Sequence, residues 1–260
     1  MNQQEFSNKC EQYLKMGKDY INFSKAMLEK FGTLNFTKNS LDNFQKIICL
    51  IVAKSVTTAR CALRCAEKGY TIDALILLRS IYENRVNLLY LLQKERANRA
   101  RRFSDFGEWQ MRNDLKLRLQ YPFKDQQAKE KIEKDIKKLD KICTKLKQKY
   151  KIERRWNYWS GINMKDLSDK VGLGDMYAVL YGDLSALIHG TAKSMHAYIE
   201  ITQEGVNFKV GPSYLYMEKC LKYFCECMND ILYQFNTVFN LGLEKKHQEI
   251  ESKFEKLVKL

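Results

Sequence analysis

Residues 71–93, TIDALILLRSIYENRVNLLYLLQ, predict the helix that decides the fold of this chain. Thr71 is a favourable N-cap residue, and neither Pro nor Gly interrupts the run that follows. Apolar side chains recur on most of the circumference of this helix, so it is stable only with neighbours on most sides. We therefore expect it at the centre of a multi-helix bundle.

The flanking segments repeat the helical spacing of apolar residues and predict the helices that surround this centre. The chain has only two prolines and twelve glycines among 260 residues, which leaves few interruptions for long helices. We predict an all-α fold class, a multi-helix bundle. Its further helices are expected at residues 3–32, 41–68, 97–119, 125–151, 163–171 and 176–192, after Pro212, and from residue 243 onward.

One segment departs from the helical pattern. Residues 197–210 alternate β-branched, aromatic and polar residues around Gln203-Glu204-Gly205, which predicts one small β-hairpin. We find no internal repeat, so we expect residues 1–260 to form a single helical domain. Within it, residues 124–152 are predicted to form a long, protruding, charged helical arm, and residues 243–260 a helical tail.

The cysteines and the apolar runs of the chain bear on its location. The eight cysteines lie mostly within apolar helical patterns, without the C-x2-C pairing typical of a zinc site. We interpret them as reduced core thiols and expect no metal and no cofactor. The N-terminus lacks the order of a signal peptide, and no apolar run approaches the roughly 20 residues that span a bilayer. These features predict a cytoplasmic protein with no membrane contact.

Positive charge is concentrated in the predicted arm. The chain has a formal net charge of +14, and residues 124–155 hold thirteen Lys or Arg against six Asp or Glu. An excess of this size attracts RNA and other polyanions. The alternative interpretation is a solvated helix face without a partner.

His189 is the histidine that most suggests chemistry. On a helical wheel, Ser185 and His189 lie one turn apart at the edge of the predicted buried arc. The alternative is a structural histidine that hydrogen-bonds to Ser185 or Tyr181 at the edge of the core. Gly190 lets a ligand approach closely, or ends the helix. The arc consists of Tyr177, Leu180, Tyr181, Leu184, Leu187 and Ile188.

Arg79, Glu83 and Asn87 form one polar line on the central helix, at i, i+4 and i+8. Because the rest of this helix is apolar, the line should lie near the interior, where charge must be paired. Arg79 and Glu83 are then either a structural ion pair or part of a pocket. In the second case Glu83 raises the basicity of His189 and Arg79 binds a phosphate, with Ser185 and Tyr181 beside them.

A basic and aromatic cluster follows the central helix. Arginines beside aromatic rings suit phosphate and base contacts, whereas a solvated helix terminus with snorkelling side chains is the alternative. The residues that we assign to nucleic-acid or phosphate binding are Arg96, Arg99, Arg101, Arg102, Trp109, Arg154 and Arg155.

Three short motifs carry a resemblance to a known family. They are ALILLRSIYE at residues 74–83, RARRF at 99–103, and WSG at 159–161 leading to YGDLSALIHG at 181–190. The chain resembles the DUF5677 family, helical proteins of uncharacterised function, over about residues 45–215.

The layout is also similar to the HEPN superfamily, helical bundles that include metal-independent ribonucleases of toxin and phage-defence systems. Those enzymes carry an arginine four to six residues before the catalytic histidine. The resemblance implies that His189 acts on RNA and that the chain forms a homodimer. Asp183 stands at that spacing here and cannot neutralise a phosphate, so Arg79 would have to supply the charge.

Two functions follow from these patterns. The first is a protein that acts on RNA or another phosphate-bearing ligand, as a metal-independent endoribonuclease of a toxin or phage-defence system. The second is a binding or scaffolding module without catalysis, which contacts a protein or nucleic acid through its basic arm. A homodimer is compatible with both.

Overall fold

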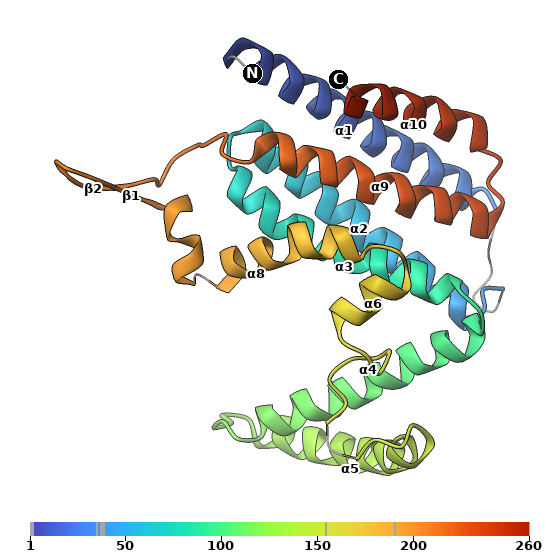
Figure 1. The fold of residues 1–260 in the computed structure, drawn as a ribbon. Coiled ribbons are helices and arrows are strands. Elements are labelled where there is room, and N and C mark those ends of the chain that lie inside the picture. The colour runs from blue at the N-terminus through green and yellow to red at the C-terminus, as the bar shows by residue number, and fades with distance from the viewer. Residues whose placement is uncertain (1–2, 35, 37–39, 154, 190, 260) are drawn as a thin grey trace. The chain divides into compact units, whose positions relative to one another are not determined.

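The computed structural model describes residues 3–34, 36, 40–153, 155–189 and 191–259 (Figure 1). Arg154 and Gly190 lie outside the described residues, so the predictions made for them stay predictions. The chain divides into two compact units, one of residues 1–90 and 168–260 and the other of residues 91–167. The expectation of a single domain stays a prediction.

Long helices form the first unit and confirm the predicted all-α class. The third helix, whose first part belongs to this unit, has an apolar side that is fully buried, including Leu78, Ile81 and Val86. α9 packs against α1 and α2, and α10 packs against α1 (Figure 1). The bounds of these helices are α1 Gln3–Gly32, α2 Asn43–Glu67, α3 Thr71–Leu92, α9 Met217–Phe239 and α10 Glu244–Lys259.

The turn between α2 and α3 is tied to the segment before α9. Gly69 has φ +79°, and a Cβ at this position would lie 2.8 Å from Cβ of Pro212. Gly69 therefore satisfies both a left-handed backbone and a close approach. The hydroxyl of Thr71 donates to the carbonyl of Ser213 at 2.9 Å. Thr71 is thus the first residue of α3, and its hydroxyl makes this tertiary contact, while its predicted role as N-cap stays a prediction.

The second unit is a helical hairpin of α4 (Arg96–Arg118) and α5 (Gln126–Lys149). Asp125 caps α5 by accepting from the amides of Gln127 and Ala128. α5 buries a narrow apolar stripe against α4, and this stripe includes Cys143 rather than its neighbour Ile142, which is exposed. Residue 143 continues the alternating spacing of four and three, whereas residue 142 lies about 100° around the helix. The buried stripe is Ile132, Ile136, Leu139, Cys143 and Leu146.

The predicted helix at 176–192 is not one regular helix. α6 (Met164–Lys170) is followed by α7 (Gly174–Met176), the π-helical segment η1 (Tyr177–Tyr181), α8 (Gly182–His189) and the 3-10 helix η2 (Ala192–Ala197). The wider π turn changes the angular phase of the residues after it. Ile188, predicted to be buried, is exposed near the end of α8, about 100° around the helix from its buried neighbour Leu187, whereas Leu180, Leu184 and Leu187 are buried as predicted.

The predicted hairpin is confirmed as β1 (Ile199–Thr202) paired with β2 (Gly205–Phe208) in antiparallel register. Ile199 lies opposite Phe208, and Ile201 lies opposite Val206. α9 begins later than expected, because Tyr216 adopts φ +63° immediately before it. Within the part of the chain that the structure describes, no helix combines the length and the apolar character needed to cross a membrane.

Candidate functional site

Arg79, Glu83 and Tyr181 form a closed network between α3 and η1. Nε of Arg79 donates to Oε1 of Glu83 at 2.9 Å, and Nη2 of Arg79 donates to the Tyr181 hydroxyl at 2.7 Å. That hydroxyl donates to Oε1 of Glu83 at 3.1 Å. The guanidinium also lies over the Tyr181 ring, with Cζ 4.4 Å from its centroid. Three of the residues singled out from the sequence therefore meet in space.

The contacts of this network raise the pKa of both Arg79 and Tyr181. Burial acts to lower the pKa of Arg79, but the hydrogen bond to Glu83 and the interaction with Tyr181 raise it overall. Burial, followed by the charge of Glu83, raises the pKa of Tyr181 to about 12, against the opposing charge of Arg79. At neutral pH Arg79 is therefore a guanidinium and Tyr181 an un-ionised phenol. Tyr181 acts as a hydrogen-bond donor rather than as a base.

The π-helical turn sets the position of Tyr181. Its ring stacks on that of Tyr177, with centroids 4.6 Å apart and planes at 19°. Tyr82 of α3 packs against the same ring at 6.2 Å. Single π turns occur frequently at functional sites, because they redirect side chains without ending the helix. The sequence placed Tyr181 in the buried arc but did not indicate this irregularity.

His189 and Ser185 lie on α8, beyond this network. His189 is exposed at the end of the helix, and Ser185 is half-buried. Glu83 accepts hydrogen bonds from Arg79 and Tyr181. Among the described residues it forms no hydrogen bond with His189. The proposed pairing of Glu83 with His189 therefore stays a prediction.

Arg85 is the buried charge that the sequence patterns did not single out. Its side chain is buried, and its Nη2 lies 2.6 Å from Oδ2 of Asp230 on α9. Nη1 also donates to Sδ of Met176 at 3.2 Å. Burial acts to lower the pKa of Arg85, but the charges of Cys227 and Asp230 raise it overall. A charge within the apolar run of α3 was the available signal, since such a group requires a buried partner.

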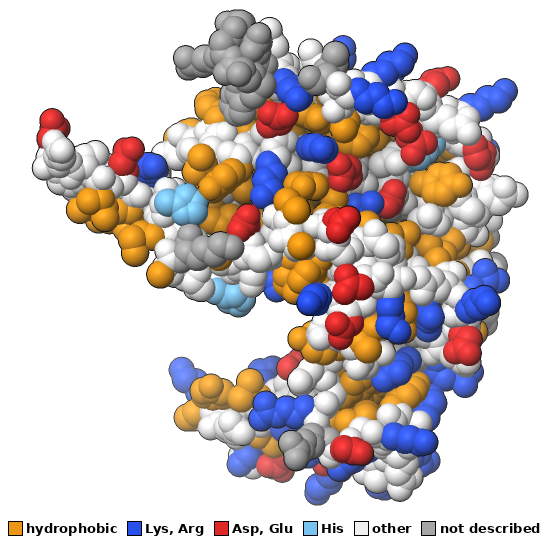
Figure 2. Space-filling model, in the orientation of Figure 1, with side chains coloured by type: hydrophobic (Ala, Val, Ile, Leu, Met, Phe, Trp, Pro, Cys, Tyr) orange, Lys and Arg blue, Asp and Glu red, His pale blue; other side chains and the backbone are white. Residues whose placement is uncertain are grey.

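Positive charge gathers on the second unit. Residues 91–167 hold 22 Lys or Arg against 11 Asp or Glu, so this unit carries a net charge of +11 of the chain's +14. Figure 2 shows many Lys and Arg side chains over the surface that α4 and α5 form. Five exposed lysines follow the face of α5 opposite its buried stripe, and we call them the lysine face. They are Lys134, Lys137, Lys138, Lys141 and Lys145.

Arg102 of α4 has a fixed place in the same unit. Its Cζ lies 5.1 Å from the ring centroid of Tyr150 and 5.9 Å from that of Trp156. Gly161 has φ +82°, and a Cβ there would collide with the guanidinium. Nε of Arg102 and Nε1 of Trp156 are buried and have no hydrogen-bond partner within the described residues. The aromatic rings and Gly161 thus orient this guanidinium.

The other residues assigned to nucleic-acid binding are placed differently. Arg99 donates from Nη1 to Gln93 at 3.1 Å. Arg101 and Arg155 are exposed, as is Arg96 at the start of α4. Trp109 is buried in the core of the hairpin against Trp156, with centroids 5.9 Å apart. That packing leaves the ring of Trp109 no free face for a base, so we leave it out of the proposed surface.

This is therefore an all-helical protein with a strongly basic helical hairpin. The chain belongs to the DUF5677 family, described as a family of unknown function, whose model matches residues 45–207. This match confirms the resemblance drawn from the sequence motifs. No curated protein and no solved structure matches the chain. The similarity to HEPN proteins stays a prediction.

Proposed function

We propose that this protein binds RNA through the basic surface of the α4–α5 hairpin. The observation that carries the proposal is the charge distribution, with a net +11 on residues 91–167 against +3 on the rest of the chain. Neutralising phosphates with Lys and Arg releases counterions, and this release supplies much of the affinity for nucleic acid. The hairpin concentrates cations in the way that such binding requires.

The lysine face forms a row of cations along α5. From Lys134 to Lys145 it extends about 16 Å along the helix, which suits several consecutive phosphates of one strand. Lys138 lies 3.6 Å from Asp135, and its side chain remains 66% exposed. An exposed pair at this spacing stabilises by only about 0.2–0.5 kcal/mol, so Lys138 can exchange Asp135 for a phosphate.

Arg102 supplies an oriented contact. Stacking on Tyr150 and Trp156 restricts the guanidinium before a ligand arrives, which lowers the entropy lost on binding. Within the described residues no carboxylate pairs with Arg102, whereas Arg112 pairs with Asp140 at 2.6 Å. A guanidinium without an internal anion suits a phosphate, which it binds through two parallel donors.

Binding of a labelled single-stranded RNA across a range of salt concentrations tests this proposal. A variant with the five lysines of the lysine face changed to Gln should bind more weakly and show a smaller salt dependence. The slope of log K against log salt should fall by about 0.7 for each phosphate that the variant no longer neutralises. The matched control changes five lysines of α10 to Gln, namely Lys245, Lys246, Lys253, Lys256 and Lys259.

The two variants differ in where the charge is removed, not in how much is removed. Equal reductions in affinity would mean that only the total charge counts and would contradict a binding surface on the hairpin. Unchanged binding by the lysine-face variant would contradict the proposal directly. Replacing the RNA by DNA or heparin separates RNA preference from attraction to any polyanion, because the phosphate contacts alone do not distinguish these ligands.

A second candidate is a metal-independent ribonuclease centred on His189. Its supporting observation is that Arg79, Glu83 and Tyr181 converge on η1, which leads directly into the helix that ends at exposed His189. An accessible imidazole can take the proton of a ribose 2′-hydroxyl or protonate the leaving oxygen. Wild-type protein should then cleave total RNA in the presence of a chelator, and His189→Ala should not. Absence of cleavage by the folded wild type would overturn this candidate.

A further inference from the structure

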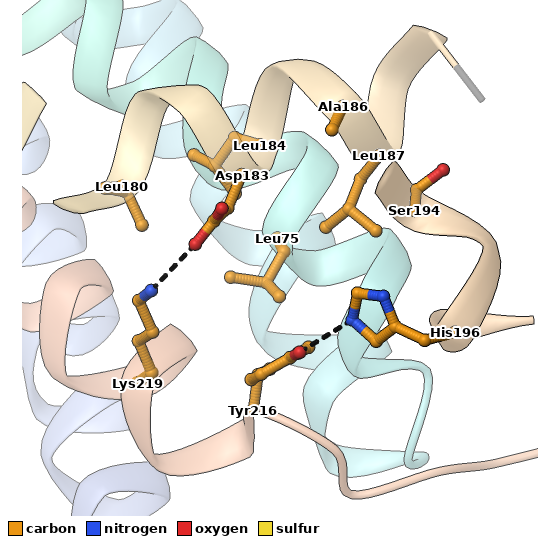
Figure 3. Close-up of a pocket in the computed structure, with 10 residues that line it drawn as sticks. All are labelled: Leu75, Leu180, Asp183, Leu184, Ala186, Leu187, Ser194, His196, Tyr216 and Lys219. Atoms are coloured by element: carbon orange, nitrogen blue, oxygen red, sulfur yellow. Dashed lines mark hydrogen bonds and ion pairs between the residues drawn. The ribbon is translucent and has the colours of Figure 1, made fainter. Parts of the chain in front are cut away.

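A cavity of about 80 Å³ lies in the first unit among α3, η1, α8, η2 and the beginning of α9 (Figure 3). A space of this size holds several water molecules or the apolar body of a small ligand. Figure 3 shows Leu75, Leu180 and Leu187 directed into it. Its floor is apolar and buried. The floor consists of Leu75, Leu180, Leu184, Ala186 and Leu187.

Two polar pairs border the mouth of the cavity. Nζ of Lys219 lies 3.3 Å from Oδ2 of Asp183 and donates to the carbonyl of Val179 at 3.2 Å. Nε2 of His196 and the hydroxyl of Tyr216 share a hydrogen bond of 2.8 Å. Both pairs are marked by dashed lines in Figure 3. An apolar floor with a few polar groups at the mouth is the usual construction of a small-molecule site.

Two backbone irregularities meet at this cavity. The π-helical segment η1 contributes Leu180 to its floor, and Tyr216 at its mouth has φ +63°. A bulky residue in the left-handed region is strained, because its Cβ crowds the backbone. Strained residues cluster at ligand-binding sites, where the surrounding contacts hold them in place. The bond from Tyr216 to His196 is such a contact.

We propose that this cavity binds a small monocarboxylate with a compact apolar body. The body would replace water on the leucine floor, and the carboxylate would accept a hydrogen bond from the Lys219 ammonium. Lys219 is suited to this role because its ion pair with Asp183 is long and the Asp183 side chain is 52% exposed. An exposed pair of this kind stabilises little, so a ligand carboxylate can take the place of Asp183.

Tyr216 and His196 would bind the second carboxylate oxygen. Either partner can donate in their hydrogen bond, since an imidazole nitrogen and a phenol each act as donor or acceptor. When Nε2–H of His196 donates, the proton of the Tyr216 hydroxyl is available to the ligand. The site lies wholly within the first unit and does not depend on the proposed RNA surface.

The test uses full-length protein with labelled leucine methyl groups, titrated with butanoate and followed by NMR. Saturable shifts are expected at the methyl groups of Leu180, Leu184 and Leu187. Butan-1-ol, which has the same apolar body without charge, should bind about tenfold more weakly. Absence of saturable shifts with both probes would overturn the site. Equal affinity for both probes would overturn its specificity for a carboxylate.

Substitutions separate the charge from the apolar floor. Lys219→Met keeps the aliphatic stem, so it should weaken butanoate by about tenfold or more and leave butan-1-ol unchanged. Lys222→Met, on the same helix but outside the cavity lining, is the matched control and should bind both probes normally. Ala186→Leu fills the cavity and should abolish both shifts. Wild-type affinity for butanoate in the folded Lys219→Met variant would contradict the proposal.

Discussion

Arg85 of α3 and Asp230 of α9 form an ion pair across 145 positions of the sequence, with Nε donating to Oδ2 at 2.7 Å. The Arg85 side chain is buried, and that of Asp230 is 32% exposed. Arg85 is 9% exposed. Among the charged residues of α3 it is the buried one, since Asp73, Arg79 and Glu83 are exposed or half-buried. Because an unpaired charge there would be costly, the pair fixes the register of α3 against α9.

Asp230→Ala should therefore be strongly destabilising. It leaves the buried Arg85 guanidinium without its ion-pair partner, and we expect a loss of about 3 kcal/mol in the free energy of unfolding. The double variant Arg85→Met/Asp230→Leu should be more stable than Asp230→Ala, since it removes both charges. Urea denaturation measures both values. A loss below about 1 kcal/mol for Asp230→Ala would show that the pair is not essential to the packing.

The stability of the fold should fall in alkaline solution. Burial is the first cause that raises the pKa of Tyr13, Tyr82 and Tyr181, each to about 12, from the ordinary value of 10. Folding therefore favours the un-ionised phenols. Their contribution to the free energy of unfolding is complete below about pH 10 and is lost as the pH rises from 10 towards 12. Urea denaturation at several pH values measures the decline.

Tyr181→Phe provides the check on this assignment. Without the phenol, part of the alkaline decline should disappear, whereas at neutral pH the loss of its hydrogen bonds should cost about 1 kcal/mol. An exposed tyrosine serves as control, since Tyr121→Phe should leave the pH dependence as it is in the wild type. An unchanged decline in Tyr181→Phe would mean that its ionisation is not coupled to unfolding.

Two glycines of the second unit should respond in opposite ways to alanine. Gly161→Ala meets both a positive φ and the Arg102 guanidinium, so it should lower the stability by more than about 1 kcal/mol and weaken RNA binding. Gly107 lies within α4, where a Cβ would meet nothing within 4 Å, so Gly107→Ala should raise the stability by about 0.5–1 kcal/mol. Thermal unfolding and RNA titration of the two variants distinguish these outcomes.

The burial of α3 can be tested by truncating leucines to alanine. Leu88 of α3 is fully buried, and Leu88→Ala should cost about 2–5 kcal/mol, because it removes apolar packing and leaves a cavity behind. Leu50 of α2 is 58% exposed, so Leu50→Ala should change the free energy of unfolding by less than about 1 kcal/mol. Similar costs for the two substitutions would contradict the burial of Leu88 on the packed side of α3.

The sequence predicted several components of the candidate site, but not how distant components come together in the folded chain. The i, i+4 spacing of Arg79 and Glu83 predicted their ion pair, because helix geometry alone brings such residues together. Their contact with Tyr181 joins residues 102 positions apart and depends on how η1 lies against α3. The π turn at Tyr177–Tyr181, which helps to position Tyr181, is also something that a wheel of constant period cannot represent.

Local patterns predicted the long helices, a hairpin within residues 197–210 and the basic character of residues 124–155, because periodicity, turn residues and charge are local properties. Only the folded chain brings Asp230 to Arg85 and places His196, Tyr216 and Lys219 around one cavity. These relationships join distant segments, and their energies come from packing and burial. A local pattern does not specify which distant segment will supply the partner.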